Sequence, residues 1–317
     1  MGAYNIGFDI GGSHIAGALF DGADELARLE RPYPKGEPEK APALIAGMAK
    51  ALEASLGAGQ SISYIGIAVP GSLSRDKRRI LNAYNLGFED TPLPELIENE
   101  LGGRINVLMA NDADAAAWAE YCCGALRGYE NCLLITLGTG VGGGVILNGA
   151  LFTGGMGNGV ELGHMIIDRL AGPVCSCGVS GCFEARCSAT AIIRRARESI
   201  AKNEHSLIYG ACGGDAQRID AKLVIDAAKR GDGEAMAIFN DYVDALGSGI
   251  ASIINTLDPM AIAIGGGVSG AGEFLLEPVR KNVEKKSFYK EHAAIVKAKL
   301  GNDAGIVGAA LLHRTAK

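Results

Sequence analysis

One pattern occurs twice in this sequence and constrains the fold more than any other feature. Residues 4–9 and 15–20 are apolar runs typical of strands; a glycine turn joins them, and Asp21-Gly22 follows. A run at 132–136, a glycine-rich turn and a second run ending at Asn148-Gly149 repeat this order about 127 residues later. Asp-Gly and Asn-Gly favour hairpin turns because both tolerate positive φ. The repetition predicts a duplicated α/β fold with one glycine hairpin per half, each aimed at a common cleft.

Further strands and helices are expected from the spacing of the apolar residues. We expect strands at 62–69, 105–109, 145–147, 260–264 and 294–300, and helices at 41–56, 92–101, 111–123, 188–203, 220–230, 232–257, 273–286 and 305–313. Asn111 or Asp112 is placed to cap the alanine-rich helix at 111–123, and Ser188 to cap a later one. No low-complexity tract or linker marks a domain boundary.

Composition bounds the class of protein. A chain of 317 residues, 48% apolar and 21% charged, is long enough for two domains with their own cores. A net charge of −6 without a long basic run disfavours nucleic acid and anionic membranes as partners, and no apolar stretch is long enough to cross a bilayer. Eight cysteines without a signal peptide favour a cytoplasmic protein with reduced thiols and a metal over a disulfide framework.

A histidine and three cysteines lie close together in residues 164–184, with glycines that let the backbone turn back. The set is His164, Cys175, Cys177 and Cys182. Thiolates and imidazole are ligands that Zn²⁺ prefers in tetrahedral sites, and four protein ligands leave no open position, so this zinc would be structural. The alternative is a group of buried free cysteines, the usual state of cysteine. The tight clustering with glycines favours the metal.

Two carboxylates flank this cluster. Glu161 precedes the histidine and Glu184 follows the last cysteine. A metal bound there could hold both side chains in place for function.

Three glycine loops could hold phosphate groups. They are residues 9–13 (DIGGS), 137–144 (LGTGVGGG) and 264–270 (IGGGVSG). Backbone N–H groups without side chains can approach phosphate oxygens closely, and the hydroxyls of Ser13, Thr136 and Thr139 could add donors. One such loop alone is weak evidence, because glycine turns between strands are common. Three of them fit one nucleotide held in a cleft.

A nicotinamide dinucleotide is the alternative ligand for two of these loops, which match G-x-G-x-x-G. In the loop at 137–144 a strand follows, whereas the dinucleotide fingerprint requires a helix. The loop at 264–270 does lie between a strand and a helix, but no second βαβ half follows it. The sequence therefore disfavours a dehydrogenase.

Two aspartates are placed for chemistry at the ends of strands. Asp112 follows Asn111 at a helix start, where a carboxylate can accept a proton from a hydroxyl that Asn111 positions. Local sequence alone favours the alternative, a helix cap without chemistry. Asp9 ends the first strand beside a glycine turn and could hold Mg²⁺ through water, or else stabilise the turn.

Taken together, these segments resemble the ROK family of sugar kinases and sugar-responsive repressors, within the actin-like ATPase superfamily. The resemblance covers nearly the whole chain. DIGGS and LGTGVGGG are similar to the family's phosphate loops, AIGGGVSG to its adenosine loop, and ANDADAAAWAE to the segment with the catalytic base. VELGH followed by CSCGVSGCFE resembles its zinc signature. NLGF, VELGHM and SATAII are most similar to the family's bacterial glucokinases.

The resemblance implies a fold and a domain division. The fold would be a duplicated two-domain actin-like ATPase (ribonuclease H-like) α/β fold, with a cleft between the domains and a structural zinc site. Residues 1–118 plus 303–317 would form a smaller N-terminal domain, and residues 119–302 a larger C-terminal domain with the zinc motif. The resemblance also implies a homodimer.

The resemblance further implies ATP-dependent phosphorylation of a hexose at its 6-hydroxyl, with glucose as the leading substrate and glucose 6-phosphate as the product. Asp112 would be the general base that takes the proton of the 6-hydroxyl. The sugar would contact Gly71, Asn85, Asn111, Asp112, Glu161, His164 and Glu184. ATP, with Mg²⁺ near Asp9, would contact Asp9, Gly11, Gly12, Ser13, Thr136, Gly138, Thr139, Gly140, Gly265, Gly266 and Gly267.

The chain departs from the family pattern at three places. Ser13-His14 replaces the usual Thr-Lys of the first phosphate loop, which weakens a phosphate-side cation near neutral pH. Asp114 replaces the usual second Asn after the base and adds a negative charge near it. Tyr84 replaces the proline that commonly precedes Asn85. None of these positions is one that the reaction requires.

Three other functions share part of this evidence. Kinases of N-acetylmannosamine, N-acetylglucosamine or another hexose would share every motif. A sugar-binding transcriptional regulator of this family carries a helix-turn-helix domain ahead of DIGG, for which a loop starting at Asp9 leaves no room. A binding protein that has lost catalysis would rest only on the Ser13-His14 departure.

Overall fold

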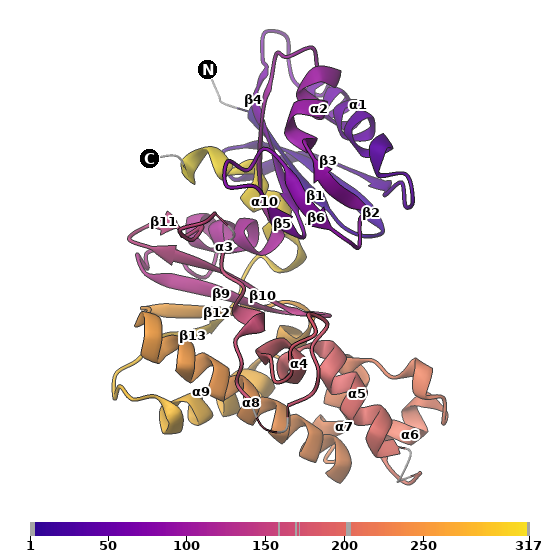
Figure 1. Ribbon diagram of the computed structural model, residues 1–317, viewed down its shortest axis with the longest axis vertical. Helices are drawn as coiled ribbons and strands as arrows, with labels where there is room; N and C mark the ends of the chain where they lie inside the picture. Colours follow the sequence, from indigo (N-terminus) through magenta and orange to yellow (C-terminus); the bar gives the residue numbers. More distant parts are fainter. Residues whose placement is uncertain (1–3, 158, 169, 171, 201–203, 316–317) are drawn as a thin grey trace. The chain divides into compact units, whose positions relative to one another are not determined.

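The computed structural model describes residues 4–315 apart from 158, 169, 171 and 201–203. It divides into two compact units (Figure 1). Unit 1 consists of Met1–Glu130, Gly144–Val160 and Leu300–Lys317, and unit 2 of Asn131–Gly143 and Glu161–Lys299. In the part of the chain that is described, no helix is both long and apolar enough to span a membrane.

Unit 1 is built on a five-stranded mixed sheet with the order β3-β2-β1-β4-β8. Its strands are β1 (Tyr4–Ile10), β2 (His14–Asp21), β3 (Asp24–Pro32), β4 (Ile62–Val69) and β8 (Asn106–Asn111). The first three are antiparallel, whereas β1, β4 and β8 run parallel. Parallel neighbours end at the same edge of a sheet, so three strand ends meet there.

Helices cover both faces of this sheet (Figure 1). Alternate residues of β4 point to opposite faces: Ile65 and Ile67 belong to a large core with α1 (Ala41–Glu53) and α2 (Leu93–Glu100). Ala68 lies on the other face, in a small cluster with α3 (Asp112–Cys123) and α10 (Ala304–Ala310).

Helix α10 lies directly on the strands because small residues line the contact. A Cβ at Gly7 of β1 would overlap the carbonyl of Ile306, and one at Gly66 of β4 would overlap that of Ala309. The indole N–H of Trp118 in α3 donates to the carbonyl of Leu311 just after α10, at 2.9 Å. This end of the chain is therefore part of the core of unit 1.

A small antiparallel sheet, which the sequence did not predict, follows β4. It consists of β5 (Ser72–Leu73), β6 (Ile80–Ala83) and β7 (Phe88–Thr91). Its buried apolar residues, Leu73, Ile80, Ala83 and Phe88, belong to the same core as those of α1 and α2. The sheet carries the turn at 84–87 next to the ends of the parallel strands.

Unit 2 contains most of a second sheet with the same arrangement, in the order β11-β10-β9-β12-β13. Its strands are β9 (Cys132–Leu137), β10 (Val141–Leu147), β11 (Ala150–Leu151), β12 (Ala261–Gly265) and β13 (Ala294–Lys297). Strands β9, β12 and β13 are parallel. The division between the units passes through β10. The duplication that the repeated hairpin predicts is thus present in the strand order.

Helices form the rest of unit 2. They are α4 (Phe183–Cys187), α5 (Ala189–Ile200), α6 (Leu207–Cys212), α7 (Ala221–Lys229), α8 (Gly233–Leu257) and α9 (Glu273–Lys286). Short 3₁₀ turns across both units are Pro38–Lys40, Leu162–His164, Ala216–Arg218, Gly267–Ala271, Gly301–Asp303 and Leu312–Thr315. Positions 201–203 of the helix expected at 188–203 lie outside the described residues.

The boundaries between the two units lie at 130/131, 143/144, 160/161 and 299/300, whereas the sequence predicts domain boundaries at 118/119 and 302/303. A buried carboxylate explains part of the difference. Glu120 of α3 is fully buried, and its two oxygens accept hydrogen bonds from the N–H groups of Ala125 and Leu300, at 2.6 and 2.7 Å. These bonds attach the end of α3 and the returning chain to unit 1. Gly144 likewise approaches Ala117 so closely that a Cβ would touch that side chain.

The second glycine loop is shorter than expected. Strand β10 begins at Val141, so Gly142, Gly143 and Gly144 are strand residues, not loop residues. A Cβ at Gly143 would lie 2.6 Å from the Leu162 side chain. These glycines therefore allow close packing on the strand, while Gly138–Gly140 form the turn.

Candidate functional site

The candidate catalytic residues lie at the ends of the three parallel strands of unit 1. Asp9 is near the end of β1, and Asn111 at the end of β8 is in register with Val69 of β4. Gly71 follows β4 after Pro70, and Asp112 begins α3. In α/β sheets this edge, the carboxyl end of the parallel strands, is where ligands bind.

Asn111 is the N-cap of α3. Its Oδ1 accepts hydrogen bonds from the N–H groups of Ala113 at 2.9 Å and Asp114 at 3.4 Å. Its Nδ2 donates to the Gly71 carbonyl at 3.2 Å. The cap expected from the sequence is confirmed, and the same side chain fixes the turn after β4 against the start of α3. A second amide hydrogen is what Asn111 could offer to a hydroxyl.

Asp9 and Asp112 form an acidic pair with raised pKa values. The Asp112 side chain is accessible to solvent at the start of α3. Nearby protein atoms still remove part of its surrounding water, which raises its pKa, whereas hydrogen bonds from the backbone of Asp112 and Ala113 lower it. Burial raises the pKa of Asp9 to about 6; the charge of Asp112 adds to this rise and that of His14 opposes it. Two neighbouring carboxyl groups of this kind are typical of proton transfer or cation binding.

Gly71 positions the hairpin that carries Asn85. Its φ is +104°, and a Cβ there would overlap the carbonyl of Asn82 in β6. Only glycine combines this dihedral angle with this close approach. Asn85 lies in the exposed turn between β6 and β7. The hairpin therefore lies beside the strand ends that carry Asn111 and Asp112.

The first glycine loop is a tight turn between β1 and β2. The Gly11 N–H donates to the His14 carbonyl at 2.9 Å, and the Ser13 hydroxyl lies 2.9 Å from His14 Nδ1. The other ring nitrogen lies 3.6 Å from a Glu30 carboxylate oxygen of β3. The imidazole that stands at the usual lysine position thus lies between a hydroxyl and a carboxylate.

Asp114, the second departure from the family pattern, is accompanied by a lysine. Only 2% of Asp114 is exposed, and a Cβ at Gly159 would lie 3.2 Å from its Oδ2. Burial lowers the pKa of Lys77, whereas the charge of Asp114 raises it. Lys77 Nζ donates to the Gly157 carbonyl at 2.5 Å, and both side chains line a cavity of about 340 Å³ in unit 1. Sequence reasoning missed Lys77 because it lies in a turn far from Asp114 in the chain.

The four expected zinc ligands come together in unit 2. Their donor atoms all lie within 4.8 Å of one another. Cys175 Sγ is 3.7 Å from His164 Nδ1, and Cys177 Sγ is 3.6 Å from Cys182 Sγ. Ligands about 2.3 Å from a tetrahedral zinc ion lie about 3.7 Å apart, whereas a disulfide is about 2.05 Å long. The donor set and its spacing fit a zinc ion.

Two glycines form the turns that the cluster requires. Gly178 and Gly181 have φ values of +86° and +84°. The Gly178 N–H donates to the Cys175 carbonyl at 2.9 Å, which folds the chain back between the cysteines. The turn chemistry inferred from the sequence is therefore observed.

Glu184 borders this cluster and reaches beyond it. Its Oε1 accepts a hydrogen bond from the Ser176 hydroxyl at 3.0 Å and lies 3.5 Å from Cys175 Sγ. Its Oε2 accepts a hydrogen bond from the Val141 N–H at 3.0 Å. Glu161, by contrast, is exposed where the chain enters the 3₁₀ turn at Leu162–His164.

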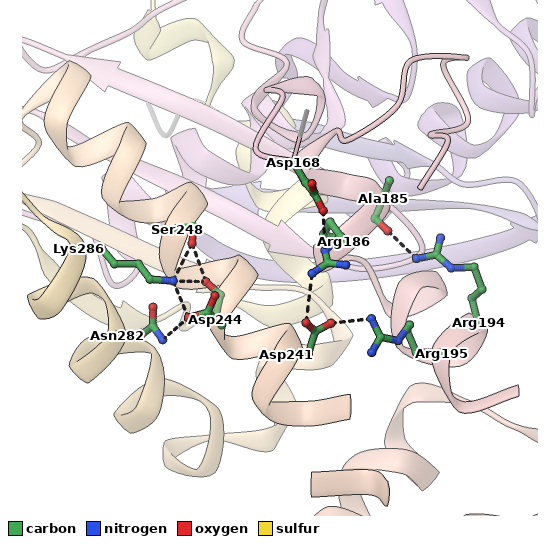
Figure 2. A network of polar contacts seen from close by, with 10 residues as sticks. All are labelled: Asp168, Ala185, Arg186, Arg194, Arg195, Asp241, Asp244, Ser248, Asn282 and Lys286. Atoms are coloured by element: carbon green, nitrogen blue, oxygen red, sulfur yellow. Dashed lines mark hydrogen bonds and ion pairs between the residues drawn. The ribbon is translucent and has the colours of Figure 1, made fainter. Parts of the chain in front are cut away.

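Arginines hold the short helix α4, on which Glu184 lies. Figure 2 shows Arg186 of α4 between Asp241 of α8, at 3.1 Å, and Asp168, at 3.9 Å. Arg195 of α5 contacts the other oxygen of Asp241 at 2.8 Å, and Arg194 donates to a carbonyl of α4 at 3.1 Å. A five-residue helix has little stability of its own, so these contacts to α5 and α8 fix its position.

The second and third glycine loops lie side by side in unit 2. Thr136 of β9 is in register with Gly265 of β12. A Cβ at Gly266 would overlap the backbone of Leu137. The carbonyl of Thr139 accepts a hydrogen bond at 2.7 Å from the Thr190 hydroxyl at the start of α5.

A cavity of about 400 Å³ borders both loops. Its lining combines glycine backbone, apolar side chains and charged side chains of α7, including Gly138, Thr139, Ile225, Lys229, Gly267 and Val268. Its size and mixed lining suit a small ligand with an aromatic ring and polar groups. The Asp9 pair belongs to unit 1, whereas this cavity and the Cys/His cluster belong to unit 2.

Several known proteins are similar to this chain over most of its length. A glucokinase from Thermotoga maritima is 40% identical over 256 residues, which are 80% of this chain and 79% of that protein. An N-acetylmannosamine kinase from Salmonella agona is 35% identical over 309 residues, 97% of each chain. The crystal structure of a ROK family glucokinase from Streptomyces griseus in complex with glucose and AMPPNP has a TM-score of 0.81 and 33% identity, over 99% of this chain and 100% of that chain. The family model described as ROK matches residues 5–316, and the chain belongs to the ROK family.

Proposed function

We propose that this chain transfers the terminal phosphoryl group of ATP to the 6-hydroxyl of a hexose, with glucose as the favoured substrate. The observation that carries the proposal is the Asp112 carboxylate at the start of α3, next to Asp9 at the carboxyl ends of parallel strands. A family membership shared with glucokinases over most of the chain supports the same reaction.

In this proposal, Asp112 accepts the proton of the sugar hydroxyl as that oxygen attacks the phosphorus atom. A carboxylate with a raised pKa is a better proton acceptor than an ordinary aspartate, and partial loss of surrounding water gives Asp112 this property. Asn111 and Gly71, joined by a hydrogen bond, hold the hydroxyl near it. Phosphoryl transfer depends mainly on positioning and on stabilisation of charge, so fixed polar groups account for much of the rate.

Asp9 is the proposed partner of Mg²⁺. Its pKa is raised partly by the charge of Asp112, and a cation beside it would relieve that repulsion. Oxygen ligands of this type suit Mg²⁺, which neutralises phosphate charge when bound. The glycine N–H groups of the loops at 11–13 and 138–140 and the cavity in unit 2 would hold the nucleotide.

The Cys/His cluster is the proposed structural zinc site. Its donor atoms fit the metal, and a bound zinc ion would supply rigidity to the segment at 164–184. Glu184 and His164 would then contact sugar hydroxyls from this segment, with Glu161 as a second carboxylate. A homodimer, which the family resemblance implies, is part of the proposal and is tested by sedimentation equilibrium.

A kinase of N-acetylmannosamine is the second candidate, because the relative from Salmonella agona with that name is similar along 97% of this chain. Both substrates offer a 6-hydroxyl, so the motifs do not separate them. A coupled assay of ADP release with glucose, N-acetylmannosamine, N-acetylglucosamine and fructose at equal concentration separates the two. A higher kcat/KM for glucose supports the proposal, whereas preference for an acetylated sugar selects the second candidate. Absence of ADP release with every sugar would contradict both kinase functions and favour a sugar-binding regulator.

The role of Asp112 is tested by Asp112→Asn. We expect kcat to fall by about 10³-fold while the sugar Kd changes less than about threefold, because the amide keeps the shape but cannot accept the proton. Sugar binding is measured by calorimetry and turnover by ADP release. Near-normal kcat in this variant would exclude Asp112 as the base.

A further inference from the structure

Both carboxylate oxygens of Glu184 are engaged, and they contact different parts of unit 2. Oε1 accepts a hydrogen bond from Ser176, which lies between two cysteines of the cluster. Oε2 accepts one from the N–H of Val141, the residue directly after the second glycine loop. One side chain therefore connects the Cys/His segment to the loop that would hold the nucleotide.

The glycine loop is shaped around this carboxylate. A Cβ at Gly140 would overlap Glu184 Oε2, although the backbone of Gly140 is not in the left-handed region. The absence of a side chain at this position is thus explained by the carboxylate rather than by backbone strain. On the other side of the turn, the Gly138 carbonyl accepts a hydrogen bond from the N–H of Ala189 in α5, at 2.7 Å. A hydrogen bond from α5 therefore holds the start of the loop at Gly138, and Glu184 holds its end at Val141.

The helix that carries Glu184 is itself anchored. Arg186 binds Asp241 of α8, as Figure 2 shows. The buried hydroxyl of Tyr242 in α8 donates to the Cys187 carbonyl at the end of α4, at 2.9 Å. Because α4 is attached to the long helix α8 at two positions, Glu184 provides a fixed acceptor for the Val141 N–H.

We propose that Glu184 is a positioning residue for the second glycine loop, and that it sets the affinity of this loop for the phosphates of a nucleotide. The proposal rests on the proposed function, in which Glu184 also contacts the sugar, and it adds an effect on nucleotide binding in the absence of sugar. A role limited to the sugar would leave that binding unchanged. The two roles are therefore separable by experiment.

The experiment measures the Kd of Mg-ADP without sugar, by calorimetry, in four proteins. For Glu184→Ala we expect a rise of about tenfold, because a hydrogen bond to a charged group is lost from the loop. For Glu184→Gln we expect a rise of less than about threefold, since its amide oxygen can still accept from Val141. Glu284→Ala is the control, an exposed carboxylate of α9 outside the glycine loops and the Cys/His cluster, and should bind ADP as the wild type does.

A second route leaves Glu184 in place. Gly140→Ala puts a methyl group where the carboxylate lies, and we expect it to weaken ADP binding about tenfold in the wild type. In the Glu184→Ala background the same methyl group has room, so its effect should be much smaller. The two substitutions should therefore be non-additive in a double-mutant cycle. Elemental analysis checks that each variant keeps the zinc content of the wild type.

The outcomes distinguish this proposal from the proposed function. Unchanged ADP affinity in Glu184→Ala, or additive effects in the cycle, would overturn the positioning role. If the same variant lost sugar affinity, the proposed kinase function would still stand. A wild-type protein that binds neither ADP nor sugar would overturn both. Weaker ADP binding in Glu184→Ala and Gly140→Ala, with normal binding in Glu284→Ala, supports the positioning role.

Discussion

Asp9 is a residue whose position lowers the stability of the folded protein. Its pKa rises from 3.8 to about 6 on folding, so between these pH values the folded state binds more protons than the unfolded state. The free energy of unfolding therefore increases as the pH falls from 7 through 6, and the charged form is unfavourable at pH 7. Such strain at strand ends is common where a carboxylate serves function.

Asp9→Asn tests this directly. At pH 7 we expect Tm to rise by about 2–6 °C, because an unfavourable charge is removed, while turnover falls by at least about 100-fold. The difference in Tm should shrink at pH 4.5, where Asp9 is protonated in the folded wild type. Thermal unfolding at the two pH values measures this, with the exposed Asp21→Asn as the control. A lower Tm at pH 7 would contradict the assignment of burial as the cause.

The pair of Lys77 and Asp114 gives a second prediction at this scale. Lys77→Met should destabilise unit 1 by about 1–2 kcal/mol, because the buried Asp114 loses a neighbouring positive charge. In the double variant with Asp114→Asn, most of this loss should be recovered. Urea unfolding of the four proteins of the cycle measures the coupling. A loss in the double variant equal to the sum of the two single losses would show that the two charges do not interact.

Residue chemistry was predictable from the sequence where it depends on near neighbours in the chain. The cap formed by Asn111 and the His164 cluster both follow from local spacing. The effect of Asp114 on the pKa of Lys77 and the hydrogen bond from Val141 to Glu184 join segments that are distant in the chain. No pattern within either segment indicates these partners.

Among the elements, the long helices were the easiest to predict, and α4 was missed. Helix α8 (Gly233–Leu257) has a continuous apolar face and a cap at Asp232. Helix α4 has five residues, too few for a periodic pattern, and contacts with α5 and α8 maintain it. Strand β3 (Asp24–Pro32) was missed because it is charged and mostly exposed at the sheet edge, where pairing with β2 forms it.

The anchoring of α4 is testable through Arg186. Arg186→Met should raise the sugar KM about tenfold with a smaller change in kcat, because Glu184 moves while Asp112 is untouched. Arg186→Lys keeps a cation near Asp241 and should recover part of the affinity. Arg197→Met on the exposed side of α5 is the control. Equal changes in kcat and KM in Arg186→Met would argue for a general loss of structure.

At the scale of the whole molecule, the duplicated sheets were predictable and the division into units was not. The repeated hairpin indicates two sheets of the same kind, and their strand orders agree. The unit boundary is determined by contacts such as those of Glu120 with Leu300, which composition does not encode.

Zinc removal should affect the two units unequally. We expect about one zinc ion per chain in the wild type and none in Cys177→Ser, since the metal binding energy contributes to local folding. Hydrogen exchange should then speed up in residues 164–187, whereas β1 and β4 of unit 1 keep their protection. Mass spectrometry of deuterium uptake and elemental analysis measure the two effects. A wild type without zinc would rule out the metal site.

The contact of α10 with the bare backbone of β1 and β4 has a consequence for how the chain reaches its native state during synthesis. The strands of unit 1 leave the ribosome first, but α10, which packs on the glycine backbone of their second face beside α3, is made only after all of unit 2. Nascent unit 2 can bury its own core while unit 1 still exposes an uncovered sheet face. Translation of the segment around Ala304–Ala310 is then the event that completes the first-made half of the protein.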